Sequence, residues 1–551
     1  MTNYTDRILY LLLFVLAMIV NFSGINIKFI TDDPALYASV AKNLLNKNLF
    51  FELFTYNQDW LDKPHFPFWC ILLSFKTFGI SEWAYRLPAL LFFTISVVYT
   101  FLFAKKFYGA ETAAAAVLIF ITAQQILLSN TDVRAEPYLM ALITGAIYHI
   151  SNLEKKFKVK DLILAALLTA CAIMTKGIFV IAAVYGSLLG QLIFQKRTNR
   201  ILNIKWLLLI ILTFIFTLPE LYALYIQFDL HPEKTVFDRH HVSGIKWFLW
   251  DSQFGRFINN GPITRQASGS VFFYLHTLLW AFAPWCLLFY ISLFKNIKDI
   301  FNKTPLPEYY SLSGGLTLFI LFSLSRFQLP FYINAVFPLF AVITARMCTD
   351  QLSKIFSALR LTGLWIFVIL LPAAVLTINF FLKPDHGLFF GFDCIFLGIF
   401  ILLIPPVVKQ AHKKAFFLTV VVALFAGFYL NTIFYKEVIP YNGQIAAAEY
   451  LNTLPIDSSK IYTLRPANNI FQFYCKRPIE LIPIEKFKGF NAPVASFFYI
   501  NQRSFDYLKQ THADFRVVRS FINYPQENIL PKFVNKATRN NLLDHVYLIT
   551  K

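Results

Sequence analysis

The 551-residue chain contains few cysteines, fewer acidic than basic residues, and none of the short motifs that mark the common soluble enzymes. Its six cysteines form no CxxC pair, so neither a disulfide framework nor a cysteine metal site is expected. The GxxxxGKS/T phosphate loop, the HExxH metalloprotease motif, the GxSxG hydrolase motif and the GxGxxG dinucleotide motif are all missing. Any chemistry must therefore depend on carboxylates and basic side chains.

Long apolar runs dominate what is present. The chain is 57% hydrophobic and 18% aromatic, and its mean hydropathy is +0.55, which indicates a multi-spanning membrane protein. The net charge of +19 could indicate nucleic acid, but Lys and Arg lie in short clusters between apolar runs, as topology signals do. We therefore expect membrane lipids, and no nucleic acid, as partners. The first run, 1–21, has no small-residue cleavage site and is expected to remain as a span.

Apolar segments of about 20 residues predict thirteen transmembrane helices. They lie near 8–29, 84–104, 112–129, 134–152, 161–175, 178–195, 206–226, 271–293, 309–325, 331–348, 361–381, 387–407 and 415–434. Basic clusters fall in every second loop, which puts the N-terminus in the cytoplasm. The extracytoplasmic parts are then loops 30–83 and 227–270, the tail after Tyr435, and tight turns at 130–133, 176–177, 326–330 and 382–386. The short run 64–79 is expected to lie in the membrane interface as an amphipathic helix.

The expected fold is an α-helical polytopic membrane protein with a C-terminal extracytoplasmic α/β domain. Residues 1–435 form the transmembrane domain and residues 436–551 the separate, periplasmic domain. In the second domain, Gly443 to Leu454 is typical of a helix. Short runs rich in Val, Ile, Tyr and Phe predict strands at 461–464, 471–475, 479–482, 495–500, 515–521 and 545–550.

The first loop brings acidic residues next to an apolar segment, where ionisable groups are costly unless they serve a site or reach water. Asp33 precedes Pro34, so it could simply cap a helix over 34–46. It could equally be a general base just outside the bilayer, aimed at an acceptor hydroxyl. Asp32 competes with it for either role.

The turn containing Asp132, Arg134 and Glu136 has two interpretations of equal weight. It could be a solvated turn held by an Asp132–Arg134 or Arg134–Glu136 contact. It could instead line an aqueous cavity on the side of the membrane that Asp33 faces, because three charges at a membrane boundary are costly otherwise.

The segment Asp62-Lys63-Pro64 offers a lysine that could be an interfacial anchor or a point charge for a lipid phosphate. Asp62 could hold that lysine or bind a divalent cation. In the second loop, which carries Arg239, Arg256 and Arg265, two arginines could clamp a diphosphate or phosphate. Tyr332 follows in a turn where tyrosines are more often interface anchors. Histidines 231, 240 and 241 lack an established metal spacing.

Carboxylates and cations on the outer face of a polytopic protein favour transfer from a lipid-phosphate donor, in which an acid deprotonates the acceptor and cations stabilise the departing phosphate. A transporter or flippase of lipid-linked sugars is the alternative, although such proteins usually place broken helices at mid-membrane. A non-catalytic scaffold is a third possibility.

The order of these elements resembles the GT-C glycosyltransferases, specifically the branch of the lipid A aminoarabinose transferases and the protein O-mannosyltransferases. Asp33 and Tyr37 match the first and last members of the branch's D-E-x-x-Y motif, and Pro34 replaces its second acid. Segment 62–69 is similar to E-K-P-P-L-x-x-W. Further matches are Arg86-Leu87-Pro88, Asp132, Thr175-Lys176-Gly177, Arg256-Phe257, Ala283-Pro284-Trp285 and Leu329-Pro330-Phe331-Tyr332 with Pro338. The resemblance covers about residues 8 to 350.

This resemblance implies an undecaprenyl- or related polyprenyl-phosphate sugar donor and a lipid A, other surface-glycan or protein acceptor. It implies Asp33 as the principal catalytic carboxylate with Asp132 assisting, and Lys63, Arg256 and Tyr332 near the lipid phosphate. A divalent metal would lie beside Asp62, although no histidine partner is found around 264–266, and Gln328 stands where the family has lysine. The expectation is a monomeric, inverting, metal-optional transferase of the bacterial inner membrane.

Overall fold

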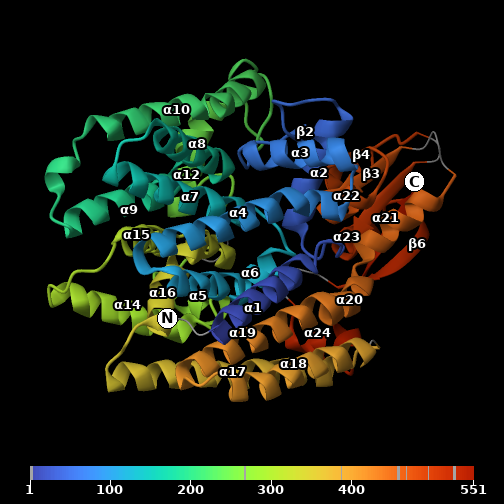
Figure 1. Ribbon diagram of the computed structural model, residues 1–551. Helices are drawn as coiled ribbons and strands as arrows, with labels where there is room; N and C mark the ends of the chain where they lie inside the picture. Colours follow the sequence, from blue (N-terminus) through green and yellow to red (C-terminus); the bar gives the residue numbers. More distant parts are fainter. Residues whose placement is uncertain are drawn as a thin grey trace.

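The computed structural model of the chain describes residues 4–265, 269–385, 387–455, 460–466, 468–493, 496–524 and 529–551. Its helices pack side by side, and the C-terminal sheet lies at the end of the bundle where α2, α3 and α22 gather (Figure 1). The first part contains α1 (Tyr4–Phe22), α2 (Asp32–Asn46), α3 (Phe66–Phe78), α4 (Glu82–Tyr108), α5 (Ala110–Ile121), α6 (Gln124–Ser129), α7 (Glu136–Lys155), α8 (Val159–Lys176), α9 (Ile181–Phe194) and α10 (Ile204–Leu224).

Short helices and a second group of long helices follow. They are α11 (Gly244–Lys246), α12 (Ser252–Ile258), α13 (Phe273–Ala281), α14 (Cys286–Phe301), α15 (Tyr310–Leu324), the 3-10 helix η5 (Pro330–Val336), α16 (Phe337–Thr349), α17 (Lys354–Leu382), α18 (Gly387–Val407), α19 (Ala411–Tyr429) and α20 (Tyr435–Val438). A two-stranded hairpin, β1 (Phe54–Thr55) and β2 (Gln58–Asp59), lies in the first large loop.

Each of the thirteen predicted spans overlaps one or more helices of the structure. Among the described residues, seven helices are long and apolar enough to cross a membrane. Four shorter apolar helices are present as well, among them α3, which corresponds to the predicted interfacial run. Two predicted spans are broken, one between α5 and α6 and the other between α13 and α14. Along α17 and α18 large apolar side chains such as Ile369 and Leu402 are exposed, as expected of helices that face lipid.

The C-terminal domain contains a five-stranded sheet in the order β4-β3-β5-β7-β6. Its strands are β3 (Ile461–Leu464), β4 (Ile479–Ile482), β5 (Phe497–Asn501), β6 (Arg516–Asn523) and β7 (Asp544–Thr550). Strand β3 is parallel to both neighbours, whereas β7 is antiparallel to β5 and β6. The helices are α21 (Gly443–Thr453), α22 (Asn469–Tyr474), α23 (Gln502–Gln510) and α24 (Pro531–Val534).

The predicted strand at 471–475 is wrong, because this segment forms helix α22. Both ends of α22 bind side chains of α2. The Asp32 carboxylate accepts hydrogen bonds from the backbone N of Asn469 at 3.1 Å and from its Nδ2 at 2.5 Å. Lys42 Nζ donates to the carbonyls of Cys475 at 2.6 Å and Phe473 at 2.9 Å. These tertiary contacts satisfy free helix-end groups and outweigh a local strand preference.

We expect Lys42→Ala to weaken the attachment of the C-terminal domain to α2, because the last carbonyls of α22 lose their cation. The free energy of unfolding should fall by about 1.5–3 kcal/mol, the range for hydrogen bonds to a charged group. Thermal unfolding and limited proteolysis of the purified protein would measure this. Lys460→Ala, on the exposed surface of the same domain, is the control, and equal melting temperatures for the two variants would contradict the prediction.

Candidate active site

Arg134, in the turn between α6 and α7, joins the two predicted catalytic aspartates. Its Nη1 lies 2.7 Å from Asp33 Oδ2 and its Nη2 lies 3.1 Å from Asp132 Oδ2. Thr31 Oγ1 also donates a hydrogen bond to Asp132. The Asp33 side chain remains 49% exposed, whereas that of Arg134 is 15% exposed. Two pieces of chain 101 residues apart thus present one accessible carboxylate beside a largely buried cation.

The two adjacent acids of the first loop have different partners. Helix α2 begins at Asp32 and its N-cap is Thr31, so the alternative in which Asp33 caps the helix is wrong. Asp33 binds Arg134, whereas Asp32 points to Asn469 of the C-terminal domain. Partial desolvation of its carboxylate raises the pKa of Asp32, although the residue keeps an exposed surface and the hydrogen bonds from Asn469 act in the opposite direction.

Arg86 holds the first loop and the Asp132 turn together. Its side chain is buried, with Nε donating to the carbonyl of Thr131 at 2.7 Å and Nη1 to those of Ile25 at 3.0 Å and Ile27 at 2.5 Å. This arginine belongs to the R-L-P match, for which the sequence predicted no individual role. Its guanidinium fixes the relative position of the segments that carry Asp33 and Asp132.

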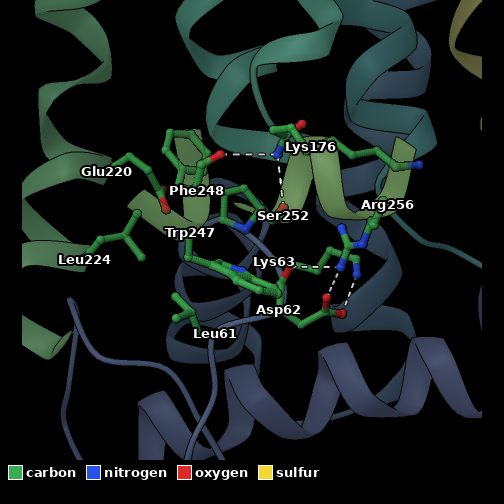
Figure 2. A pocket seen from close by; sticks show the side chains of 12 residues that line it. Leu61, Asp62, Lys63, Lys176, Glu220, Leu224, Trp247, Phe248, Ser252 and Arg256 are labelled. Carbon is green, nitrogen blue, oxygen red and sulfur yellow. Dashed lines mark hydrogen bonds and ion pairs between the residues drawn. The ribbon is translucent and has the colours of Figure 1, made fainter. Parts of the chain in front are cut away.

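Asp62, Lys63 and Arg256 form a second charged group. One oxygen of Asp62 accepts from Lys63 Nζ and the other from Arg256 Nη2. Figure 2 shows Asp62 next to both cations, with Glu220 and Leu224 across the hollow from Arg256. Burial works to raise the pKa of Asp62, but the charges of Lys63 and Arg256 outweigh it and hold that pKa below its ordinary value. Two cations against one acid leave this group with a net charge of +1.

The ring of Phe331 joins Arg134 of the first charged group to Lys176 beside the second, because its centroid lies 4.1 Å from Arg134 Cζ and 5.6 Å from Lys176 Nζ. Burial and Arg256 lower the pKa of Lys63, while the negative charges of Asp62 and Asp33 act to raise it. The side chain of Lys63 borders a narrow hollow. The hollow is lined by Leu61, Asp62, Lys63, Pro64, Lys176, Glu220, Leu224, Trp247, Phe248, Ser252, Gln253 and Arg256. It therefore lies between the first large loop and the second.

Buried Glu220 of α10 fixes the segment that carries Lys63. Its Oε2 accepts a hydrogen bond from the backbone N of His65 at 2.9 Å, and its Oε1 lies 2.9 Å from His65 Nδ1. His65 Nε2 in turn lies 3.1 Å from the carbonyl of Phe51. Because both side chains are almost fully buried, the loop around Pro64 has one well-defined position.

Lys176, from the T-K-G match, forms a buried ion pair with Glu136. Its Nζ also lies 3.8 Å from the centroid of the Tyr332 ring, so Tyr332 stacks on a cation that lines the hollow. Glu136 follows the predicted turn at 130–133, Lys176 lies in the turn at 176–177, and Tyr332 follows the turn at 326–330. These contacts place the three turns at the same end of the bundle. Here Tyr332 contacts Lys176 rather than Lys63 or Arg256.

The donor set around Asp62 does not fit a divalent cation. Both Asp62 oxygens already accept from cations, and the described residues include no group of three His, Cys, Asp or Glu side chains that could hold a metal. Gln266, in the segment where a histidine partner is expected, lies outside the described residues. His231 pairs with Glu233 in an exposed part of the second loop.

Gln328 has a structural role at the position where the family has lysine. Its Oε1 accepts from the backbone N of Ser270 at 2.9 Å, and its Nε2 donates to the carbonyls of Ser270, Phe322 and Ser323 at 3.0–3.2 Å. The amide thereby ties the end of the second large loop to the segment before η5. It has no donor left for a phosphate.

Comparisons with known proteins show similarity in sequence and in fold. Residues 62–222 match the family described as dolichyl-phosphate-mannose-protein mannosyltransferase. An undecaprenyl phosphate-alpha-4-amino-4-deoxy-L-arabinose arabinosyl transferase from Edwardsiella ictaluri (strain 93-146) is 24% identical over 337 residues, which are 60% of this chain and 58% of the relative. The chain therefore matches less than two thirds of that relative's length.

Two solved structures share the fold. ArnT from Cupriavidus metallidurans, bound to undecaprenyl phosphate, superposes with a TM-score of 0.75 at 15% identity and covers 99% of this chain and 98% of its own. The oligosaccharyltransferase from Archaeoglobus fulgidus in the apo form gives a TM-score of 0.53 at 10% identity, covering 94% and 69% of the two chains. The partial family match, the relatives and the shared fold agree with the resemblance to the aminoarabinose transferase and protein mannosyltransferase branch of the GT-C glycosyltransferases.

We expect Glu220→Ala to release the segment 62–65, because two buried donors of His65 lose their acceptor. The free energy of unfolding should fall by about 1–3 kcal/mol, the cost of leaving buried polar groups unpaired. Thermal unfolding in detergent would measure the loss. Glu220→Gln, which keeps an acceptor for the backbone N of His65, should recover part of it, and an unchanged melting temperature in Glu220→Ala would contradict this role.

Proposed function

We propose that this chain transfers a sugar from a polyprenyl-phosphate donor to an extracytoplasmic acceptor, with inversion at the sugar carbon. The observation that carries the proposal is the presence of two charged groups built from distant loops: an exposed carboxylate held by Arg134, and the net cationic cluster of Asp62, Lys63 and Arg256. The relationship to undecaprenyl-phosphate transferases supports the donor class. The protein would be a monomer of the bacterial inner membrane with its site and C-terminal domain in the periplasm.

The donor phosphate belongs near Lys63 and Arg256. When the bond between the sugar carbon and the phosphate oxygen breaks, negative charge grows on the lipid phosphate, and fixed cations lower the free energy of that state. The cluster's excess positive charge supports this assignment, because Asp62 balances only one of its two cations. Tyr332 would act through Lys176, whose ammonium group it covers, rather than by direct contact. The lipid tail would follow the apolar helices.

The acceptor belongs near Asp33. For a hydroxyl acceptor, the Asp33 carboxylate would take the proton as the acceptor oxygen attacks the sugar carbon. Arg134 occupies Asp33 Oδ2 and would keep the carboxylate aimed, while Asp132 balances the charge of that arginine. Asp32 is assigned a positioning role, since its side chain binds Asn469 and joins the catalytic helix to the C-terminal domain. That domain would then shape the acceptor side.

Purified protein incubated with labelled polyprenyl-phosphate sugars and candidate acceptors tests the activity directly. Asp33→Asn should lower turnover by about 10²- to 10⁴-fold, the usual contribution of a general base, without changing the melting temperature. Asp32→Asn is the matched control and should stay within about tenfold of wild type, because one hydrogen bond is worth about 1 kcal/mol. A larger loss in Asp32→Asn than in Asp33→Asn would reverse the assignment of the base.

Lys63→Ala should weaken binding of the lipid phosphate roughly 10- to 100-fold, as expected for a hydrogen bond between charged groups. Equilibrium binding of undecaprenyl phosphate to the purified protein would measure this. Lys234→Ala is a suitable control, because Lys234 forms its own ion pairs with Asp59 and Glu52 in the neighbouring loops. Equal affinities for wild type and Lys63→Ala would remove Lys63 from the phosphate site.

A further inference from the structure

A second hollow lies on the surface of α4, α7 and α8, well away from the candidate active site. Its volume is about 680 Å³. It is lined by Thr94, Ile95, Val98, Tyr99, Leu102, Tyr148, His149, Asn152, Lys158, Lys160, Asp161 and Leu164. His149 is thirteen residues along α7 from Glu136, so at 1.5 Å per residue it lies ~20 Å from the charged groups described above. The hollow is therefore close to the opposite membrane surface.

Two exposed lysines, Lys158 and Lys160, stand at the start of α8 and form one side of this hollow. Within the described ranges neither lysine has an ion-pair partner. The acid beside them is already engaged: Asp161 Oδ1 lies 2.7 Å from His149 Nδ1 and accepts from Asn152 Nδ2 at 3.1 Å. Asp161 offsets one of the two positive charges, so the two lysines and this acid together keep a net charge of +1.

Part of the lining of the hollow is a chain of hydrogen-bonded polar groups, which we call its polar wall. The hydroxyl of Tyr99 lies 3.1 Å from His149 Nε2, and the other ring nitrogen contacts Asp161. Lys106 Nζ adds a further cation behind this wall, donating to Ser151 and to Asn152 Oδ1 at 2.8 Å. A hydrogen-bonded wall of this kind suits a polar headgroup better than a hydrocarbon chain.

The remaining side of the hollow is apolar and open to the outside of the bundle. Ile95, Val98 and Leu102, on the outer face of α4, are exposed by 40%, 52% and 36%. Because α4 is long and apolar enough to span a membrane, this face would lie against lipid chains. Cationic and polar groups thus meet an apolar strip within one hollow, the pattern expected for a lipid with a charged head.

We propose that this hollow binds the headgroup phosphate of an anionic phospholipid, in the leaflet opposite the candidate active site. Lys158 and Lys160 would contact the phosphate, the wall of Tyr99, His149 and Asn152 would contact the glycerol headgroup, and one acyl chain would lie along Ile95, Val98 and Leu102. A neutral zwitterionic lipid would leave the positive charge uncompensated. The site is independent of the proposed sugar transfer and concerns a different lipid.

Binding of palmitoyl-oleoyl phosphatidylglycerol to the full-length protein in detergent tests this, measured by native mass spectrometry and by the rise in melting temperature. Wild type should bind this lipid more tightly than the phosphatidylcholine of the same chains. Lys158→Gln/Lys160→Gln should lower the affinity about tenfold to thirtyfold, since each lysine contributes attraction to an anionic lipid. Lys298→Gln/Lys303→Gln, two exposed lysines in another basic cluster, is the charge-matched control and should bind as wild type does.

Val98→Trp keeps both lysines and fills the apolar side of the hollow from an exposed position, so it should weaken phosphatidylglycerol binding without unfolding the protein. The proposal is overturned if the double lysine variant binds phosphatidylglycerol as wild type does. It is also overturned if phosphatidylcholine binds equally well, or if only undecaprenyl phosphate binds in a lysine-dependent way. None of these outcomes bears on the sugar-transfer assay, because binding alone is measured.

Discussion

Charge at the end of an apolar helix bundle must be balanced nearby, and this requirement organises the structure. Removing an ion from water is costly unless a partner of opposite charge and further hydrogen bonds replace the solvent. The protein meets the cost with ion pairs: Asp33 and Asp132 share Arg134, while Asp62 shares Lys63 and Arg256. The pairs Asp33–Arg134 and Asp62–Arg256 also fix one loop against another, so electrostatic balance and the geometry of the candidate site have the same origin.

The buried framework around these groups is equally specific. Arg86 donates to backbone carbonyls, and Glu220 binds the backbone and ring of His65. They determine where Asp132 and Lys63 lie, in the way that buried polar networks usually define a single arrangement. The C-terminal domain contributes in the same manner, because its Asn469 binds Asp32 at the start of α2 and so supports the first loop.

Much of this architecture follows from local sequence patterns, and the exceptions have physical causes. The apolar runs predict the helices well, because a long apolar stretch has few other options in a membrane. Segment 471–475 is an exception. Its aromatic residues favour a strand, but contacts with Asp32 and Lys42, more than 400 positions earlier, stabilise the two ends of helix α22. The branch motifs include Asp33, Lys63 and Arg256, which lie in the two charged groups of the structure. The partner of Arg134 could not be predicted, because nothing in the local sequence distinguishes an ion pair within a turn from one that reaches another loop.

The contact between α2 and α22 also bears on how the protein is made. Asp32 and Asn469 are separated by 437 residues, so the ribosome must add all the intervening helices before Asp32 can meet its partner. Throughout synthesis of the intervening helices, the start of α2 lacks the support that it has in the finished protein. A chain without Asn469 would therefore have an incompletely supported first loop, and completion of this loop would depend on synthesis of the segment that forms α22.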